Sequence, residues 1–249
     1  MIQLEEVTKI FNPGRVNEVM ALNNISLQIR QGEFVIIIGA NGSGKTTLFN
    51  TIAGAAIPTK GKVWIASEEV THLPEFKRSK WIARVFQNPF DGTAPNLTIL
   101  DNFRLAALRT QSKQLKIGIN AAFKRKVQDT IARLGMGLEN KLNQPMGTLS
   151  GGQRQALTLL MSIMDSTKVL LLDEPTAALD PKSAEIILNT AQSLIQEYQL
   201  TAIFITHNLK DAQQYGNRLL QIHKGKLVRD LDANAKQKLL LQNMYEWFG

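Results

Sequence analysis

Apolar positions along the chain follow two different spacings, and the change between them divides the sequence. The run Phe34–Ile38 is continuously apolar and rich in β-branched residues, which predicts a strand buried on both faces of a sheet. A helix is expected directly after it, over Thr46–Gly54, and a long one from about Pro181 to Tyr198. Further strands are predicted over Met1–Thr8, Ile25–Ile29, Gly61–Ala66, Val169–Leu172, Ala202–Ile205 and Gly225–Val228.

Between about residues 96 and 165 the apolar spacing becomes helical, which predicts a helical insert rather than more sheet. The tail Ala233–Phe248 also has apolar residues at helical spacing and is long enough for about one further helix. Elsewhere strands alternate with helices, which indicates an α/β domain with a largely parallel sheet. The residues that carry the helical period in the insert are Leu97, Leu100, Phe103, Leu105, Leu108, Ala122, Val127, Ile131 and Leu134.

The composition excludes several classes of protein. Of the 249 residues, 44% are hydrophobic and 20% are charged, which is typical of a folded globular chain. The absence of cysteine excludes disulfides, a thiol nucleophile and a thiolate metal site. No apolar stretch approaches the roughly 18 residues that a membrane span needs, and Glu5, Glu6 and Lys9 interrupt any signal-peptide pattern. We therefore expect a soluble protein that remains in the compartment where it is made.

The net charge of +8 is unevenly distributed. Residues 77–141 hold 13 Lys and Arg against 4 Asp and Glu, so the rest of the chain has a net charge of −1. An excess of positive charge is typical of proteins that bind nucleic acid or an anionic membrane surface. The charge alone leaves both open.

A glycine-rich loop follows the buried strand at once. Residues Gly39–Thr46 match the phosphate-loop pattern G-x-x-x-x-G-K-[ST] between a predicted strand and a predicted helix. The glycines let backbone N–H groups converge on phosphate oxygens, Lys45 can reach the β- and γ-phosphates, and the Thr46 hydroxyl can bind Mg²⁺. The alternative is a glycine-rich turn that binds nothing. The predicted nucleotide contacts are Gly39, Asn41, Gly42, Ser43, Gly44, Lys45, Thr46 and Thr47.

Two carboxylates follow a second apolar run. Val169–Leu172 places Asp173 at the carboxyl end of a buried strand, where open α/β sheets bind ligands. Asp173 would then hold the Mg²⁺ shell, and Glu174 would be the general base for the water that attacks the γ-phosphate. The alternative is that both residues only cap the next helix.

A second anion site is predicted at Leu149–Gln155, where two glycines and a serine open a helix with free N–H groups. The two glycine-rich helix starts bind one nucleotide only if the fold brings them together. A single compact domain gives no reason for them to meet.

Six motifs in order make the chain resemble the nucleotide-binding subunit of ATP-binding-cassette (ABC) transporters. The motifs are Walker A at Gly39–Thr47, a Q-loop glutamine at Gln87, the signature at Leu149–Gln153, Walker B at Val169–Asp173, a D-loop at Ala178–Asp180 and a switch histidine at His207. Two residues, Ala177 and Asn208, differ from those that are usual at these positions in the family. Neither difference removes a catalytic group, so the resemblance implies an active ATPase.

The resemblance implies a P-loop NTPase fold of the ABC ATPase type, with a parallel-sheet core, an N-terminal antiparallel β portion and an inserted helical subdomain. One domain would span residues 1–249, with its core in 1–87 and 166–232, the helical subdomain in 88–165 and a C-terminal helix in 233–249. It further implies a head-to-tail dimer with two ATP molecules at the interface. In that dimer the ATP on one subunit would contact Ser150, Gly151, Gly152 and Gln153 of the other subunit.

Four further roles are implied by the resemblance, each with a simpler alternative. Phe11 would stack on adenine, or would be a core residue. Gln87 would contact Mg²⁺ or the attacking water, or would be an ordinary surface residue. Asp180 would act across the dimer, cap the helix that begins at Pro181, or do both. His207 would hydrogen-bond the γ-phosphate, whereas an isolated histidine is more often structural.

The family implies partners in the membrane. The chain is expected at the cytoplasmic face of the cell membrane, bound to integral-membrane permease subunits and working with an extracytoplasmic substrate-binding protein. The basic segment would then face the permease rather than nucleic acid. Short motifs such as Asn12–Gly14 resemble a bacterial subgroup for which tryptophan or tyrosine import is suggested. The alternatives are a lipoprotein-release, efflux or cell-division ATPase, a soluble ABC protein acting on ribosomes or DNA, and a nucleotide-binding regulator.

Overall fold

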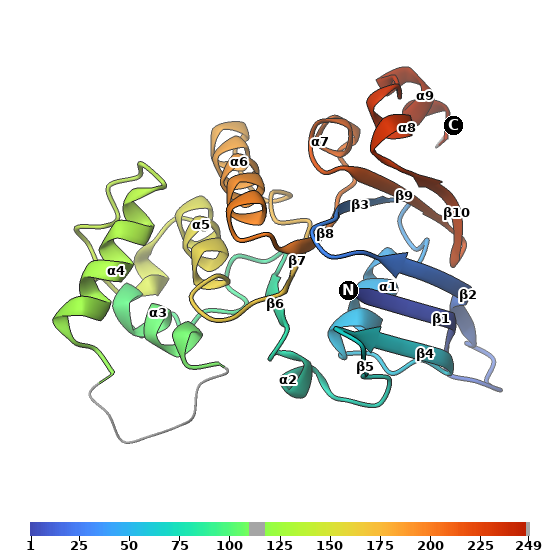
Figure 1. The fold of residues 1–249 in the computed structure, drawn as a ribbon, viewed down its shortest axis with the longest axis horizontal. Helices are drawn as coiled ribbons and strands as arrows, with labels where there is room; N and C mark the ends of the chain where they lie inside the picture. The colour runs from blue at the N-terminus through green and yellow to red at the C-terminus, as the bar shows by residue number, and fades with distance from the viewer. Residues whose placement is uncertain (110–117, 248–249) are drawn as a thin grey trace.

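Two β-sheets organise the computed structural model, which describes residues 1–109 and 118–247 (Figure 1). The larger sheet has the order β10 (Lys226–Leu231), β9 (Arg218–His223), β3 (Phe34–Ile38), β8 (Thr201–Ile205), β7 (Val169–Asp173) and β6 (Ile82–Val85). The smaller sheet has the order β2 (Val19–Ile29), β1 (Ile2–Phe11), β4 (Lys60–Ile65) and β5 (Glu68–Glu69).

The larger sheet confirms the predicted parallel core. Strands β9, β3, β8, β7 and β6 run parallel to one another, and only β10 at the edge pairs antiparallel. The strands β3, β7 and β8 are buried along their whole length, as their continuous apolar runs predict. The apolar pattern of the sequence does not predict strands β6 and β9, because Arg84, Arg218 and Gln221 interrupt their apolar runs.

The smaller sheet is antiparallel and lies on the other side of helix α1 (Lys45–Ala53). Leu48, Phe49 and Ile52 of α1 pack between the two sheets. The opposite face of the parallel sheet is covered by α6 (Pro181–Glu197), α5 (Gly151–Met161) and α7 (Leu209–Gln214). The apolar core therefore has two layers, one on each face of the parallel sheet.

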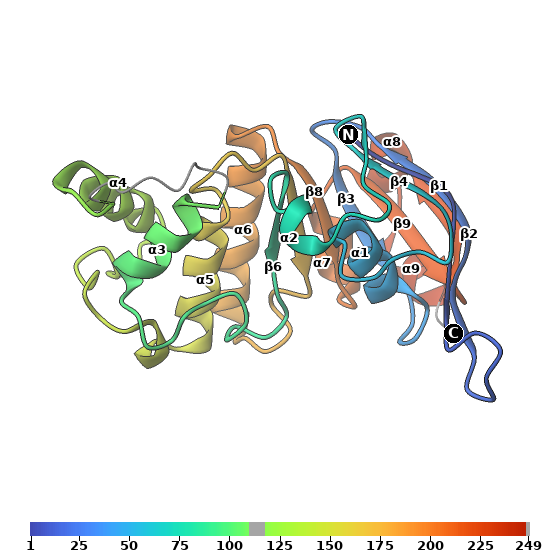
Figure 2. The same ribbon diagram turned by 90° about the horizontal axis from the view of Figure 1, so that it is seen from below.

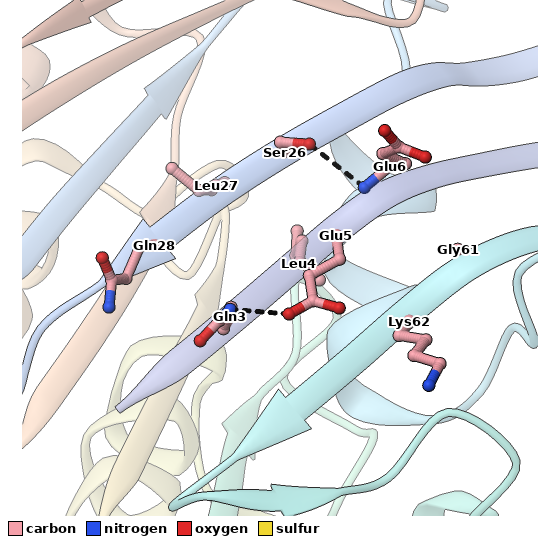
Figure 3. Close-up of a pocket in the computed structure, with 9 residues that line it drawn as sticks. All are labelled: Gln3, Leu4, Glu5, Glu6, Ser26, Leu27, Gln28, Gly61 and Lys62. Atoms are coloured by element: carbon pink, nitrogen blue, oxygen red, sulfur yellow. Dashed lines mark hydrogen bonds between the residues drawn. The ribbon is translucent and has the colours of Figure 1, made fainter.

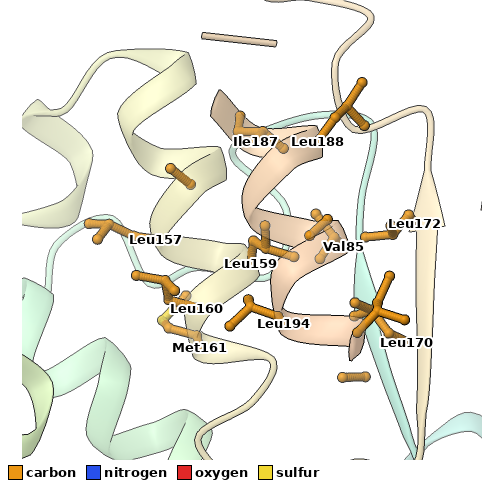
Figure 4. Packing of buried hydrophobic residues seen from close by; sticks show 14 of the residues in the cluster. Val85, Leu157, Leu159, Leu160, Met161, Leu170, Leu172, Ile187, Leu188 and Leu194 are labelled. Carbon is orange, nitrogen blue, oxygen red and sulfur yellow. The ribbon is translucent and has the colours of Figure 1, made fainter. Parts of the chain in front are cut away.

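The predicted helical insert is present at one end of the molecule, where α3 (Ile99–Ala107), α4 (Ala121–Ala132) and α5 gather in both views (Figures 1 and 2). Helix α5 joins this part to the sheet, because its apolar residues meet those of α6 (Figure 4). Leu160 of α5 and Leu194 of α6 are fully buried in that contact. Within the described residues, no helix is both long and apolar enough to cross a membrane.

The tail corrects the prediction of one C-terminal helix over residues 233–249. It forms two short helices, α8 (Ala233–Gln237) and α9 (Leu241–Glu246), with extended backbone at Leu240 between them. At the break, the Leu239 carbonyl accepts a hydrogen bond from Gln213 Nε2 at 2.9 Å. Residues 248 and 249 lie outside the described residues.

Only part of the basic segment 77–141 lies in the helical insert. Its first part forms the end of α2 (Glu75–Arg78) and strand β6 of the core. Arg78 is fully buried and donates to four backbone carbonyls, among them that of Thr51 at 2.7 Å. Arg84 is paired with Asp173. Part of the positive charge therefore stabilises the core and is not accessible to a partner.

Lys236 joins the C-terminal tail to the core through hydrogen bonds. Its side chain is buried, and Nζ donates to the carbonyls of Gln213 at 2.9 Å, Tyr215 at 2.6 Å and Gly216 at 3.0 Å, where α7 ends. A cation at a helix C-terminus satisfies carbonyls that have no partner in the helix.

We expect Lys236→Met to lower the free energy of unfolding by about 1–3 kcal/mol, because three backbone carbonyls, two of them partly buried and one buried, lose a charged donor. Urea unfolding followed by circular dichroism measures the change. Lys238→Met is the control, since Lys238 is exposed two residues away. Equal midpoints for the two variants would contradict a stabilising role for Lys236.

Candidate functional site

The candidate site lies at the carboxyl ends of four neighbouring parallel strands. In the sheet order β3, β8, β7, β6, these ends lead to the glycine-rich loop, His207, Glu174 and Gln87, respectively. Carboxyl ends of parallel strands meet at one edge of a sheet, which is where open α/β sheets bind ligands. Residues far apart in sequence therefore meet at one edge.

The glycine-rich loop is shaped by close backbone contacts. Gly39 and Gly44 allow no side chain, because a Cβ would lie 2.3 Å from the Ile222 carbonyl oxygen and 2.4 Å from the Ala21 carbonyl oxygen, respectively. Gly44 also has φ +108°, a left-handed conformation that glycine adopts readily. Helix α1 begins at the next residue without a side-chain cap, so its first N–H groups remain available to an anion.

The Lys45 side chain lies against the backbone of this loop. Its Nζ donates to the carbonyls of Gly39 at 2.7 Å and Ala40 at 3.0 Å. Burial lowers the pKa of the Lys45 ammonium, and the carboxylates of Glu174 and Asp173 partly offset that shift. The carboxylates therefore favour the charged form, which is the form that binds phosphate.

The turn between β9 and β10 braces the loop, and sequence reasoning missed it. The Gly225 N–H donates to the Ser43 carbonyl at 2.8 Å, and the Gly225 carbonyl accepts from the Asn23 N–H at 2.8 Å. Lys224 has φ +47° and Gly225 has φ +74°, the backbone of a tight hairpin turn. A Lys-Gly pair between two strand-like runs is the signal that could have identified it.

A cavity of about 530 Å³ opens beside the loop. It contains Phe11, whose side chain is 40% exposed, so the alternative of a buried core phenylalanine is wrong. The buried Ser43 Oγ faces no hydrogen-bond partner among the described residues, which leaves it available to a ligand. The predicted residues that line this cavity are Phe11, Asn41, Gly42, Ser43, Gly44, Lys45, Thr46, Thr47 and Glu174.

Glu174 is held in a strained backbone conformation. Its φ of +44° is uncommon for a residue with a side chain, and its N–H continues the sheet by donating to the Ile205 carbonyl at 3.0 Å. This geometry directs the chain away from β7 immediately after Asp173. It does not match the alternative in which the two acidic residues serve only as a helix cap, because α6 begins at Pro181 and its cap is Asp180.

Glu174 joins His207 and Gln87 in one hydrogen-bonded group. Its Oε2 lies 3.0 Å from His207 Nδ1 and 3.5 Å from Gln87 Nε2. An ionised carboxylate only accepts hydrogen bonds, so this contact with the ionised form of Glu174 needs a proton on His207 Nδ1. The three residues come from three different strand ends, and their meeting brings together the predicted base, switch histidine and Q-loop glutamine.

The residues predicted to hold Mg²⁺ suit that ion in chemistry. Thr46, Asp173 and Gln87 offer hydroxyl, carboxylate and amide oxygens, the hard ligands that Mg²⁺ prefers. Among the described residues, no group of three or more His, Cys, Asp or Glu side chains could hold a metal alone. Such a sparse set fits an ion that is bound partly by substrate phosphates.

The signature motif lies in the helical part, apart from the loop. Ser150 and Gln153 form a capping box at the start of α5, with Gln153 N–H donating to Ser150 Oγ at 3.3 Å. None of the signature residues Ser150, Gly151, Gly152 and Gln153 lines the cavity beside the loop. In Figures 1 and 2, α5 and α1 lie in different parts of the molecule. The chain alone does not bring the two predicted anion sites together.

Asp180 caps α6, as one of its two predicted roles requires. Its Oδ1 accepts a hydrogen bond from the Ser183 N–H at 3.0 Å, and Pro181 follows at the first helical position. Hydrogen bonds from Ser183 lower the pKa of the Asp180 carboxyl. The carboxylate is exposed, so the cap leaves it accessible.

A larger hollow of about 830 Å³ lies elsewhere, on the outer face of the small sheet (Figure 3). It forms where β1 bulges at Glu6, which has φ +49° and whose N–H donates to Ser26 Oγ. Gln3 Nε2 donates a hydrogen bond to Glu5 Oε1 along the same strand. It contains none of the motif residues, so we place the functional site at the smaller cavity beside the glycine-rich loop.

Comparisons with known proteins agree with this geometry. The profile of the family described as ABC transporter matches residues 22–177. The chain is 39% identical to a tyrosine transport ATP-binding protein of Clostridioides difficile (strain R20291), over 100% of this chain and 98% of that protein. It is 33% identical to the macrolide export ATP-binding/permease protein MacB of Bartonella quintana (strain Toulouse), over 96% of this chain but 35% of that protein.

Solved structures agree with the fold. A dimeric post-hydrolysis state of the ATP-binding cassette MJ0796 bound to ADP and Pi superposes with a TM-score of 0.80 and 30% identity. The match covers 94% of this chain and 99% of that one.

Proposed function

The chain belongs to the ABC transporter family and is an ATPase, and from this we propose that it drives a multi-subunit importer of amino acids, with tyrosine or tryptophan as the transported solute. The observation that supports the importer assignment is the match to the tyrosine transport ATP-binding protein along both chains. The match to MacB covers one part of a protein that is named as both ATP-binding and permease.

In the proposed mechanism, the glycine-rich loop binds the ATP phosphates. Backbone N–H groups at the start of α1 point at them, and Lys45 moves from the carbonyls of Gly39 and Ala40 to the β- and γ-phosphates. Phe11 stacks on adenine, since its ring is exposed at the edge of the same cavity. Ser43 Oγ gains the partner that it lacks among the described residues.

Hydrolysis then depends on Glu174. Its carboxylate accepts a proton from the water that attacks the γ-phosphate, which is general-base catalysis. His207 contacts the carboxylate through Nδ1, and in its doubly protonated form it would also donate Nε2–H to the γ-phosphate. Gln87 contacts the carboxylate and is one of the residues that would hold Mg²⁺, so it is placed to sense whether nucleotide is bound.

Mg²⁺, when bound, would neutralise charge on the β- and γ-phosphates. Thr46, Asp173 and Gln87 are the residues that would hold it. Asp173 ends β7, Gln87 follows the end of β6, and Thr46 lies in the first turn of α1.

We propose that catalysis requires a second copy of the chain, arranged head to tail. The support is twofold: the signature residues of α5 do not line the nucleotide cavity of their own subunit, and the similar cassette MJ0796 is dimeric. In the dimer Ser150–Gln153 of one subunit would complete the phosphate site of the other, and Asp180 would face the partner across the interface.

The proposed partners are integral-membrane permease subunits and an extracytoplasmic substrate-binding protein, with this chain bound at the cytoplasmic face of the cell membrane. Purification of the tagged chain from detergent-solubilised host membranes tests this. We expect a permease to copurify and the reconstituted complex to hydrolyse ATP faster when the binding protein is loaded with tyrosine or tryptophan.

Three results would argue against this assignment. A permease with a large extracytoplasmic domain would favour the efflux, lipoprotein-release or cell-division alternative. Stimulation by solutes other than amino acids would refute the substrate. ATP hydrolysis that responds to DNA, with salt-dependent DNA binding, would refute the transport role and the assignment of the basic segment to a permease surface.

A further inference from the structure

Arg84 contacts the carboxylate that is proposed to hold the metal. Its Nη2 lies 2.7 Å from Asp173 Oδ2, and each side chain is 13% exposed. Strands β6 and β7 are neighbours and run parallel, with Arg84 opposite Leu171, so Asp173 is two residues further along the same face. The pairing of the two strands therefore places Arg84 next to Asp173 at the edge of the sheet.

The guanidinium of Arg84 is clamped as well as paired. Its Cζ lies 5.3 Å from the centroid of the Phe49 ring, which comes from α1, and 4.7 Å from that of Phe86, which follows β6. Cation–π contacts of a partly buried arginine favour one position of the planar group. Arg84 therefore holds Asp173 Oδ2 in place, and Oδ1 has no hydrogen-bond partner within the described residues.

We propose that Arg84 is a positioning residue for the metal: it orients Asp173 so that Oδ1 faces the metal bound with ATP. The proposal rests on the proposed Mg²⁺–ATP site and deepens it. Arg84 does not line the nucleotide cavity, so it should affect the contribution of the metal to ATP binding and leave the binding of metal-free ATP unchanged. Residues that orient metal ligands typically contribute about 10–100-fold to metal affinity.

The test compares dissociation constants of the non-hydrolysable analogue AMP-PNP in EDTA and in excess Mg²⁺, measured by competition with a fluorescent nucleotide. For Arg84→Met we expect the EDTA constant to stay within about twofold of wild type and the gain in affinity from Mg²⁺ to fall about tenfold. Arg84→Lys keeps the charge but loses the planar fork, so its gain should be intermediate.

Arg133→Met is the matched control, because it removes an exposed pair with Glu197 outside the site. Its Mg²⁺ gain should equal that of wild type. An unchanged gain in Arg84→Met would show that the pair is only structural, and an increased gain would show that Arg84 repels the metal; either overturns the proposal. If Arg84→Met does not fold, Arg84→Lys decides by the same ratio. Absence of nucleotide binding by the wild type would instead refute the proposed ATP site.

Discussion

Glu174→Gln should lower steady-state ATP hydrolysis by about 10²–10⁴-fold while ATP binding stays within a few-fold of wild type. The amide has nearly the shape of the carboxylate, so His207 and Gln87 keep a partner at the same place. An amide cannot take the proton of the attacking water. Lys45 and the glycine-rich loop, which bind the phosphates, are unchanged.

Blocked hydrolysis also predicts a change in assembly. ATP that binds but is not cleaved should hold two subunits together, so Glu174→Gln should elute as a dimer from size-exclusion chromatography in Mg-ATP and as a monomer without nucleotide. Glu185→Gln is the control. Because Glu185 is exposed on α6, this variant should hydrolyse ATP at the wild-type rate. A variant that elutes only as a monomer in Mg-ATP would argue against the sandwich dimer. Hydrolysis near the wild-type rate would exclude Glu174 as the base.

The sequence predicts this site well where one short pattern contains both the strand and its chemistry. The apolar runs before Gly39 and before Asp173 predict two parallel strands, and parallel strands end at the same edge of a sheet. The meeting of Glu174 with His207 and Gln87 follows from that rule once β8 and β6 are known to flank β7. Strand β6 was missed, so the position of Gln87 rested on family resemblance alone.

The features that the sequence did not predict depend on register and tertiary packing. Arg84 is an interruption in an apolar run, and only the pairing of β6 with β7 shows that it faces Asp173. The Gly225 turn supports the loop from more than 180 residues away in the chain. The count of basic residues in 77–141 was correct, but a count does not reveal that Arg78 is buried among carbonyls. Charge becomes a surface property only after burial is known.

Two inactive variants should restore activity when they are mixed. Lys45→Met removes the phosphate-binding cation, and Ser150→Arg blocks the start of α5, so each variant alone should form no complete site and lose ATP hydrolysis. In a head-to-tail dimer, each site combines the loop of one subunit with the signature of the other. A mixed dimer places both changes in one site and leaves the second site intact.

An equal mixture should therefore recover up to about half of wild-type activity, since only mixed dimers contain a complete site and each has one intact site of two. A colorimetric phosphate assay measures the recovery. Mixing Lys45→Met with Glu174→Gln is the control, because both changes affect the loop side of the site and no intact site can form. A mixture that stays as inactive as its parents would show that the signature of one subunit does not complete the site of another. The separation of α5 from the loop within one chain makes recovery the expected result.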